Sequence, residues 1–166
     1  MHACELAARQ LLKDCDVRRQ RRSGPGGQHR NKVESAIVLV HRPSGVRAEA
    51  TERRNQHENR RVALKRLRLN LALDLRSERS PEAIPTPRWS TRAEKGVFRV
   101  NTGHEDFAPL LAEALDVIQL ERYDVAAAAR RLEVSSSQLI RFLKLEPQAL
   151  RIVNQRRQSM GLHRLH

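Results

Sequence analysis

The chain of 166 residues is long enough for one domain or two small ones, and its net charge of +13 indicates an anionic partner. Because only 3% of the residues are aromatic, we expect Arg and Lys contacts with phosphate, rather than base stacking, to dominate recognition of that partner. The absence of a signal-like or membrane-length apolar run, and of any metal or redox spacing between Cys4 and Cys15, predicts a cytoplasmic protein without metal or cofactor.

The first half of the chain has the pattern of a small α+β domain. Apolar residues near the N-terminus predict a short helix, and β-branched runs predict strands on either side of a Pro-Ser-Gly turn. The expected elements are a helix over 3–13, a basic strand over 16–22, a buried strand over 36–40, a turn over 43–45 and a return strand over 46–51.

The clearest predicted element is a long helix over residues 55–75. Asn55 is a plausible N-cap, and leucines at 64, 67, 71 and 75 step by three, four and four residues, which gives one apolar face. Cations occupy much of the remaining surface. We expect the leucines to pack on the hairpin and a basic face to stay free, so that a domain over residues 1–76 is a small sheet covered by one helix.

The segment from Ser23 to Lys32 places glycines inside a run of cations, with no acid between residues 17 and 33. Glycine adopts backbone angles closed to other residues and lets the backbone approach a ligand closely. The surrounding cations suit phosphate groups. The tripeptide Gly26-Gly27-Gln28 would therefore be an uncharged part of a loop whose flanking cations bind a polyanion.

This segment resembles the catalytic loop of the class I peptide chain release factors. The similarity extends through Val33-Glu34-Ser35-Ala36, the turn at residues 41–46 and the start of the helix at 52–59, so that about residues 16–75 follow the family pattern in order. A lone Gly-Gly-Gln would be weak evidence, because short motifs recur by chance, but matched positions in order are strong evidence.

The resemblance implies hydrolysis of the ester that joins a nascent peptide to tRNA on the ribosome. In the family, the backbone N–H of the glutamine, Gln28 here, stabilises the oxyanion, and Gly26 and Gly27 allow the turn that aims it. We take these three residues as the catalytic site. The predicted RNA-binding residues are all Arg or Lys and are Arg18, Arg19, Arg21, Arg22, Arg30, Lys32, Arg60 and Arg61. The implied partners are large-subunit ribosomal RNA and peptidyl-tRNA, with no membrane.

The second half is predicted to be a Pro-containing linker over residues 77–103, followed by an all-α region over 104–166. Trp89 is expected to be a packing anchor within the linker. Helices are predicted from about residue 106 to 120, from 125 to 133 behind an Asp124 cap, from 135 or 136 onward, and from Pro147 to about 158.

Residues 128–143 resemble a helix-turn-helix of the DNA-binding kind, with the turn over 133–136. Only Gln138 and Arg141 would be good base readers, and this half carries a net charge of only +4, so we do not expect DNA to be the partner.

Only about fifteen residues precede the matched region, whereas release factors that read stop codons carry a large recognition region there. We therefore expect codon-independent release, as in short release-factor homologues that free stalled ribosomes. Those homologues often carry a basic, flexible C-terminal tail, which is not evident here. Two alternatives stay open: a non-catalytic RNA- or DNA-binding protein that uses the helix-turn-helix, and a fragment of a split factor that works with a partner subunit.

Overall fold

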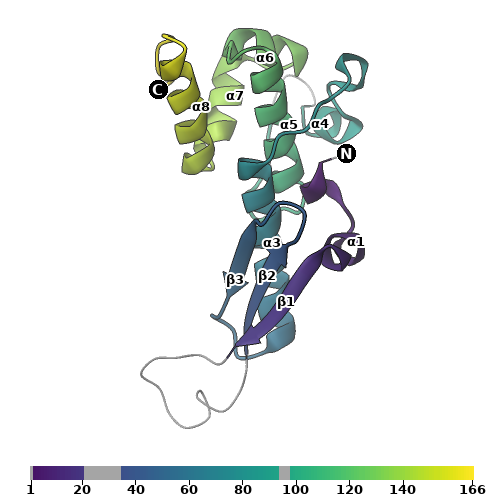
Figure 1. Ribbon diagram of the computed structural model, residues 1–166. Coiled ribbons are helices and arrows are strands. Elements are labelled where there is room, and N and C mark those ends of the chain that lie inside the picture. Colours follow the sequence, from purple (N-terminus) through teal and green to yellow (C-terminus); the bar gives the residue numbers. More distant parts are fainter. Residues whose placement is uncertain (1, 21–34, 94–97) are drawn as a thin grey trace. The chain divides into compact units, whose positions relative to one another are not determined.

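The computed structural model describes residues 2–20, 35–93 and 98–166 (Figure 1). Its contacts divide the chain into two compact units, one of residues 3–74 and one of residues 75–166 together with His2. The first unit is a small α+β domain and the second is helical, as the sequence predicts. No helix within these described ranges is long and apolar enough to cross a lipid bilayer.

The first unit contains one antiparallel sheet of three strands in the order β1 (Cys15–Gln20), β2 (Ala36–His41) and β3 (Arg47–Ala50). The central strand is apolar from Ala36 to Val40, and its first four residues are buried, so β2 forms the middle of the core. The turn between β2 and β3 uses Gly45 at φ +71°, a conformation that disfavours residues with a Cβ atom. A 3-10 turn, η1 (Ala3–Glu5), and helix α1 (Ala8–Lys13) precede the sheet.

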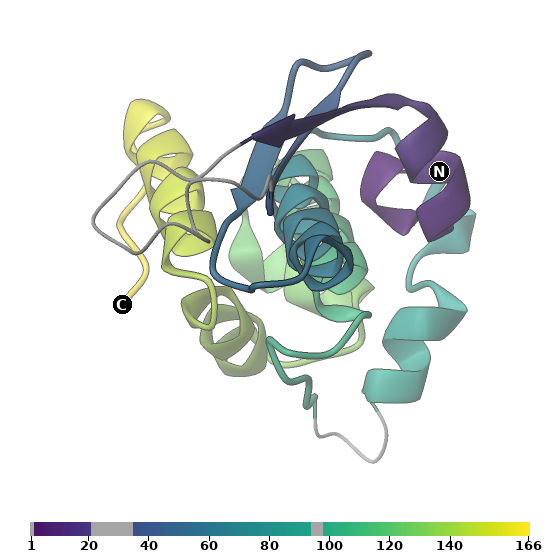
Figure 2. The same ribbon diagram turned by 90° about the horizontal axis from the view of Figure 1, so that it is seen from below.

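Helix α3 (Gln56–Asp74) lies against one face of this sheet (Figures 1 and 2). The predicted Asn55 cap is confirmed, because its side-chain oxygen accepts a hydrogen bond from the backbone N–H of His57 at 2.7 Å. The buried row differs from the predicted leucine face. Its central line runs through Asn59, Ala63, Leu67 and Leu71, all of them fully buried, whereas Leu64 is half-buried and Leu75 lies beyond the helix.

The segment over residues 77–103 is more structured than a linker. It contains a 3-10 turn, η2 (Pro81–Ala83), and helix α4 (Pro87–Arg92), which begins behind a Thr86 cap. Trp89 is fully buried, and its indole N–H donates to the carbonyl of Leu132 at 2.8 Å, which confirms its role as a packing anchor. The prediction of a linker missed this helix because proline is also common in the first helical turn. The N–H group that proline lacks has no hydrogen-bond partner within the helix at that position.

Helix α5 (Phe107–Leu120) is the centre of the second unit and is buried from Phe107 to Ile118. Two acids on it are buried with their partners. Glu113 accepts from the backbone N–H and the hydroxyl of Thr86 at 2.7 and 2.6 Å. Asp116 pairs with Arg79 at 2.8 Å and accepts from the Ser77 backbone N–H at 3.0 Å. A buried charge needs partners, and the partners of both acids come from the segment before α4. These contacts therefore hold that segment against α5.

Three further helices follow in the predicted order: α6 (Val125–Arg131), α7 (Ser136–Lys144) and α8 (Pro147–Ser159). Asp124 caps α6, as expected, and Ser135 and Gln138 form a capping box at the start of α7. Glu133 at φ +57° makes the short turn between α6 and α7. The division into separate domains over residues 1–76 and 104–166, joined by residues 77–103, stays a prediction.

Candidate functional site

The sheet brings together the parts of the chain that come directly before and after segment 21–34. Gln20, the last residue of β1, pairs directly with Ala36, the first residue of β2. Opposite residues of an antiparallel pair have Cα atoms about 5 Å apart. We call this end of the sheet, with the adjoining start of α3, the junction end. The other end, around His41 to Val46, is the hairpin end.

Asn59 fastens the junction end, and it is fully buried on α3. Its side-chain N–H groups donate to the carbonyls of Ser35 at 2.6 Å and Arg53 at 2.9 Å, and its side-chain oxygen accepts from the Arg53 backbone N–H at 2.9 Å. One amide therefore joins three parts of the chain: the residue that follows segment 21–34, the β3–α3 connection and the helix.

The sequence analysis gave Asn59 no role beyond its place in the matched pattern. A signal was present, because Asn59 stands four residues before Ala63 on the row that continues through Leu67 and Leu71. A polar residue in the apolar row of a helix must find hydrogen-bond partners when it is buried. Its partners could not be read from that row.

Four predicted RNA-binding residues are described by the structure, and all four are exposed: Arg18, Arg19, Arg60 and Arg61. The first two lie on β1 close to its end at Gln20, and the other two lie in the first turns of α3. Within the described ranges, none of these four side chains has an ion pair or hydrogen bond. Arg53 and Arg54, which the sequence analysis did not select, are likewise exposed in the adjoining connection.

The remaining predicted site residues lie outside the described residues. They are the catalytic Gly26, Gly27 and Gln28, and the cations Arg21, Arg22, Arg30 and Lys32. Their assignments stay predictions. The structure describes the residues on either side of this segment, which are Gln20 before it and Ser35 after it.

The hairpin end has a different electrostatic character. Arg42 pairs with Asp16 at 3.2 Å, and Arg47 pairs with Glu49 at 3.2 Å. His41 is buried, its Nδ1 lies 2.7 Å from the hydroxyl of Ser44, and burial lowers its pKa, an effect that Arg42 adds to and Asp14 opposes. The His41–Ser44 contact lies within the turn, and the two ion pairs are exposed.

Glu52, in the connection that follows β3, is the one acid near the junction end with a shifted pKa within the described ranges. Its partial burial alone would raise the pKa. Hydrogen bonds from the backbone N–H groups of Glu52 and Thr51, together with Arg66, outweigh that effect and lower the pKa. Glu52 is therefore a carboxylate held by α3, which makes it a poor proton acceptor for catalysis.

Among the residues that the structure describes, no three His, Cys, Asp or Glu side chains gather closely enough to hold a metal ion.

The RF-1 domain family matches residues 11–102, which include the whole sheet, the segment between β1 and β2, and α3. The chain belongs to the RF-1 domain family. Residues 103–166, with helices α5 to α8, lie beyond the matched region.

Individual relatives are similar to part of this chain. Peptide chain release factor 1 of Xylella fastidiosa is 52% identical over 63 residues, which are 38% of this chain and 17% of the relative. Peptide chain release factor 1 of Rickettsia typhi is 33% identical over 90 residues, 54% of this chain and 25% of the relative. The chain thus matches a quarter or less of the length of these release factors.

Proposed function

We propose that this chain hydrolyses the ester of peptidyl-tRNA on the ribosome, and does so without reading a stop codon. The observation that carries the proposal is the junction end. Gln20 and Ala36, which lie on either side of the segment that contains Gly26-Gly27-Gln28 in the matched RF-1 domain, pair directly, and Asn59 donates to the carbonyl of Ser35. A fixed base favours catalysis, because a reactive backbone group must be positioned to within a fraction of an ångström.

The proposed chemistry needs no ionisable group from the protein. Water attacks the ester carbonyl, negative charge develops on the carbonyl oxygen, and the leaving group is the terminal ribose hydroxyl of the tRNA. The backbone N–H of Gln28 would donate to that developing oxyanion, and loss of one such donor typically costs about 10²–10³ in rate. Gly26 and Gly27 would allow the turn, and the Gln28 side chain would shape the water site.

Docking would depend on the cations of the junction end. Arg18, Arg19, Arg60 and Arg61 are exposed and have no partner within the described ranges, so their guanidinium groups are available to phosphates. Large-subunit ribosomal RNA and peptidyl-tRNA are the proposed partners, and the cytoplasm is the proposed location. Release without a stop codon is proposed from the sequence, and the stop-codon control below tests it.

The test is release of a labelled peptide from purified ribosomes stalled on messenger RNA that ends without a stop codon. Gln28→Ala keeps the backbone N–H, whereas Gln28→Pro removes it, so the pair separates the two proposed roles of this residue. We expect Gln28→Pro to lower the release rate by about 10²-fold or more, and Gln28→Ala to lower it less.

Two controls complete the design. Ribosomes paused with a stop codon in the decoding site should not be favoured over those without one, and preference for the stop codon would overturn codon independence. If wild-type protein binds stalled ribosomes but releases nothing, hydrolysis is wrong, and the non-catalytic binding protein or the partner-dependent fragment replaces it.

A further inference from the structure

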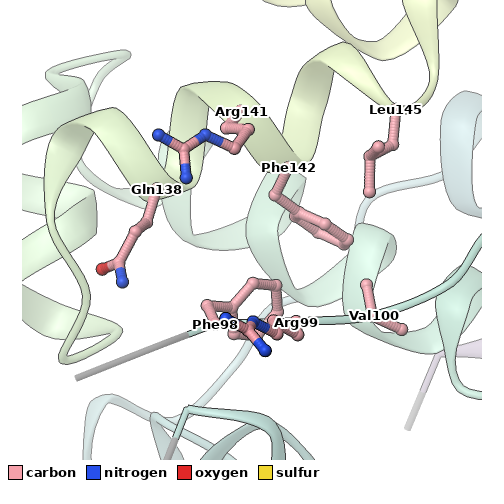
Figure 3. A pocket seen from close by; sticks show the side chains of 7 residues that line it. All are labelled: Phe98, Arg99, Val100, Gln138, Arg141, Phe142 and Leu145. Atoms are coloured by element: carbon pink, nitrogen blue, oxygen red, sulfur yellow. The ribbon is translucent and has the colours of Figure 1, made fainter. Parts of the chain in front are cut away.

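The second unit contains a pocket on the exposed side of α7. Residues 98–100 cross beside this helix, and the space between them measures about 330 Å³ (Figure 3). That volume is at the small end of the range for ligand pockets, which is roughly 300–1,000 Å³. Among the described residues, the lining combines apolar and cationic side chains with one amide and contains no acid: Phe98, Arg99, Val100, Gln138, Arg141, Phe142 and Leu145.

This pocket occupies the position expected for a DNA-reading face. The sequence analysis named Gln138 and Arg141 as the base readers of a helix-turn-helix. In the structure, the side-chain oxygen of Gln138 accepts from the Ser135 backbone N–H at 2.8 Å, as part of the capping box. A recognition helix must also project into the major groove. Here residues 98–100 lie along α7 and make the surface hollow, which disfavours a duplex groove.

The pocket has an aromatic wall. Although the chain has only five aromatic residues, four of them form one cluster: Trp89, Phe98, Phe107 and Phe142. Phe98 stacks on Trp89 with ring centroids 4.3 Å apart and meets the edge of Phe142 at 4.9 Å. Its ring is therefore held in place, while Phe98 itself is only half-buried. The low aromatic content argued against base stacking for the whole chain, but it does not argue against it at this cluster.

Two guanidinium groups adjoin the pocket from different segments, Arg141 on α7 and Arg99 on the crossing segment (Figure 3). Both are exposed, and neither has an ion pair or side-chain hydrogen bond within the described residues. Lys144, one position before the lining residue Leu145, is exposed as well. The apolar wall is therefore bordered by cations that pair with no acid among the described residues.

We propose that this pocket binds one unpaired nucleotide of single-stranded RNA. The base would contact Phe98 and the apolar side chains of Val100 and Leu145, and Arg99 and Arg141 would contact the flanking phosphates. Single-stranded RNA is commonly recognised in this way, because its bases can be splayed onto aromatic or guanidinium planes. The proposal does not depend on ester hydrolysis and gives helices α4 to α7 a role of their own.

The test uses the full-length chain and a fluorescently labelled pentamer of adenosine, a probe too short to form a duplex. Binding is followed by anisotropy and by the emission of Trp89, which is the single tryptophan and contacts Phe98. The Arg99→Ala/Arg141→Ala variant should bind about tenfold more weakly. Its matched control is Arg130→Ala/Arg151→Ala, which removes two exposed arginines of the same unit outside the pocket.

The expected result is a change in Trp89 emission on binding, lost in the pocket variant and kept in the control. Equal weakening of both variants, or binding without any change in Trp89 emission, would show that charge alone attracts RNA and would overturn the proposal. Tighter binding of an acidic pentapeptide at the same pocket would assign it to a protein partner instead. Gly27→Ala should bind the pentamer like wild type, so a failure of catalysis leaves this result unaffected.

Discussion

The two ends of the first unit use the same residue type for opposite purposes. At the hairpin end, Arg42 and Arg47 are exposed, and each is paired with a carboxylate at 3.2 Å. At the junction end, Arg18, Arg19, Arg60 and Arg61 have no such partner within the described ranges, although Arg66 on α3 pairs with Glu52. Exposure and charge are alike at the two ends. What differs is whether an acid of the same chain already satisfies the guanidinium group.

That difference shows why net charge alone does not locate a binding surface. An exposed pair contributes about 0–1 kcal/mol to stability and leaves little field for a ligand. An unpaired arginine adds no ion pair to the fold but can release counterions from a bound polyanion. We therefore expect a polyanionic partner to bind at the junction end rather than at the hairpin end.

The largest expected effect comes from removing the amide that fastens the junction end. Asn59→Ala leaves the Arg53 backbone N–H and the Ser35 carbonyl without their partner, and we expect it to lower the free energy of unfolding by about 3 kcal/mol. Asn70→Ala is the matched control, because Asn70 lies on the same helix and donates to the Arg47 carbonyl near the hairpin end. It should cost about 0.5 kcal/mol.

Denaturant unfolding of the two variants measures this contrast, and the gain in helix propensity from Asn to Ala is shared by both. Equal losses of stability for Asn59→Ala and Asn70→Ala would show that the junction end has no special dependence on its buried amide.

The second effect concerns affinity. Arg18→Ala/Arg19→Ala and Arg60→Ala/Arg61→Ala should each weaken binding to ribosomes by about tenfold and reduce the slope of log affinity against log salt by about 1.5. Arg42→Ala/Arg47→Ala removes the same charge at the hairpin end and should change neither quantity appreciably. Titration of ribosomes at several salt concentrations gives both numbers. Equivalent changes in all three variants would contradict the assignment of the binding surface.

The smallest effect is a pH dependence at the hairpin end. Because burial lowers the pKa of His41, the unfolded chain takes up this proton first as the pH falls below about 6.5. Stability should therefore decline as the pH falls from there toward the lower folded pKa, and level off below it. His41→Gln should remove this part of the profile, which unfolding measurements at several pH values would detect. If the stability of His41→Gln depended on pH as that of the wild type does, this role of His41 would be contradicted.

Much of the fold could be predicted because its signals are local. The Asn55, Asp124 and Ser135 caps, the turn at Gly45 and the apolar run of β2 each depend on a few adjacent residues. Helix α4 was missed because it is only six residues long and begins at a proline, so its packing on the rest of the second unit decides its conformation.

The candidate site divides in the same way. The Gly-Gly-Gln segment could be found from consecutive residues, whereas the hydrogen bonds of Asn59 join residues 6 and 24 positions away in the sequence. Likewise, which arginines are unpaired depends on acids that the sheet brings close, such as Asp16 beside Arg42. Contacts between distant residues need the fold before they can be assigned.

Peptide release by two glycine variants tests the central claim most directly. Gly27→Ala alters the proposed catalytic segment, and Gly45→Ala places a Cβ at φ +71° in the turn of the hairpin end, where space is open but the backbone is strained. We predict that Gly27→Ala binds stalled ribosomes normally yet releases peptide at least about 10²-fold more slowly. Gly45→Ala should lose stability but keep release within about twofold of wild type. Release by Gly27→Ala at the wild-type rate would contradict the account.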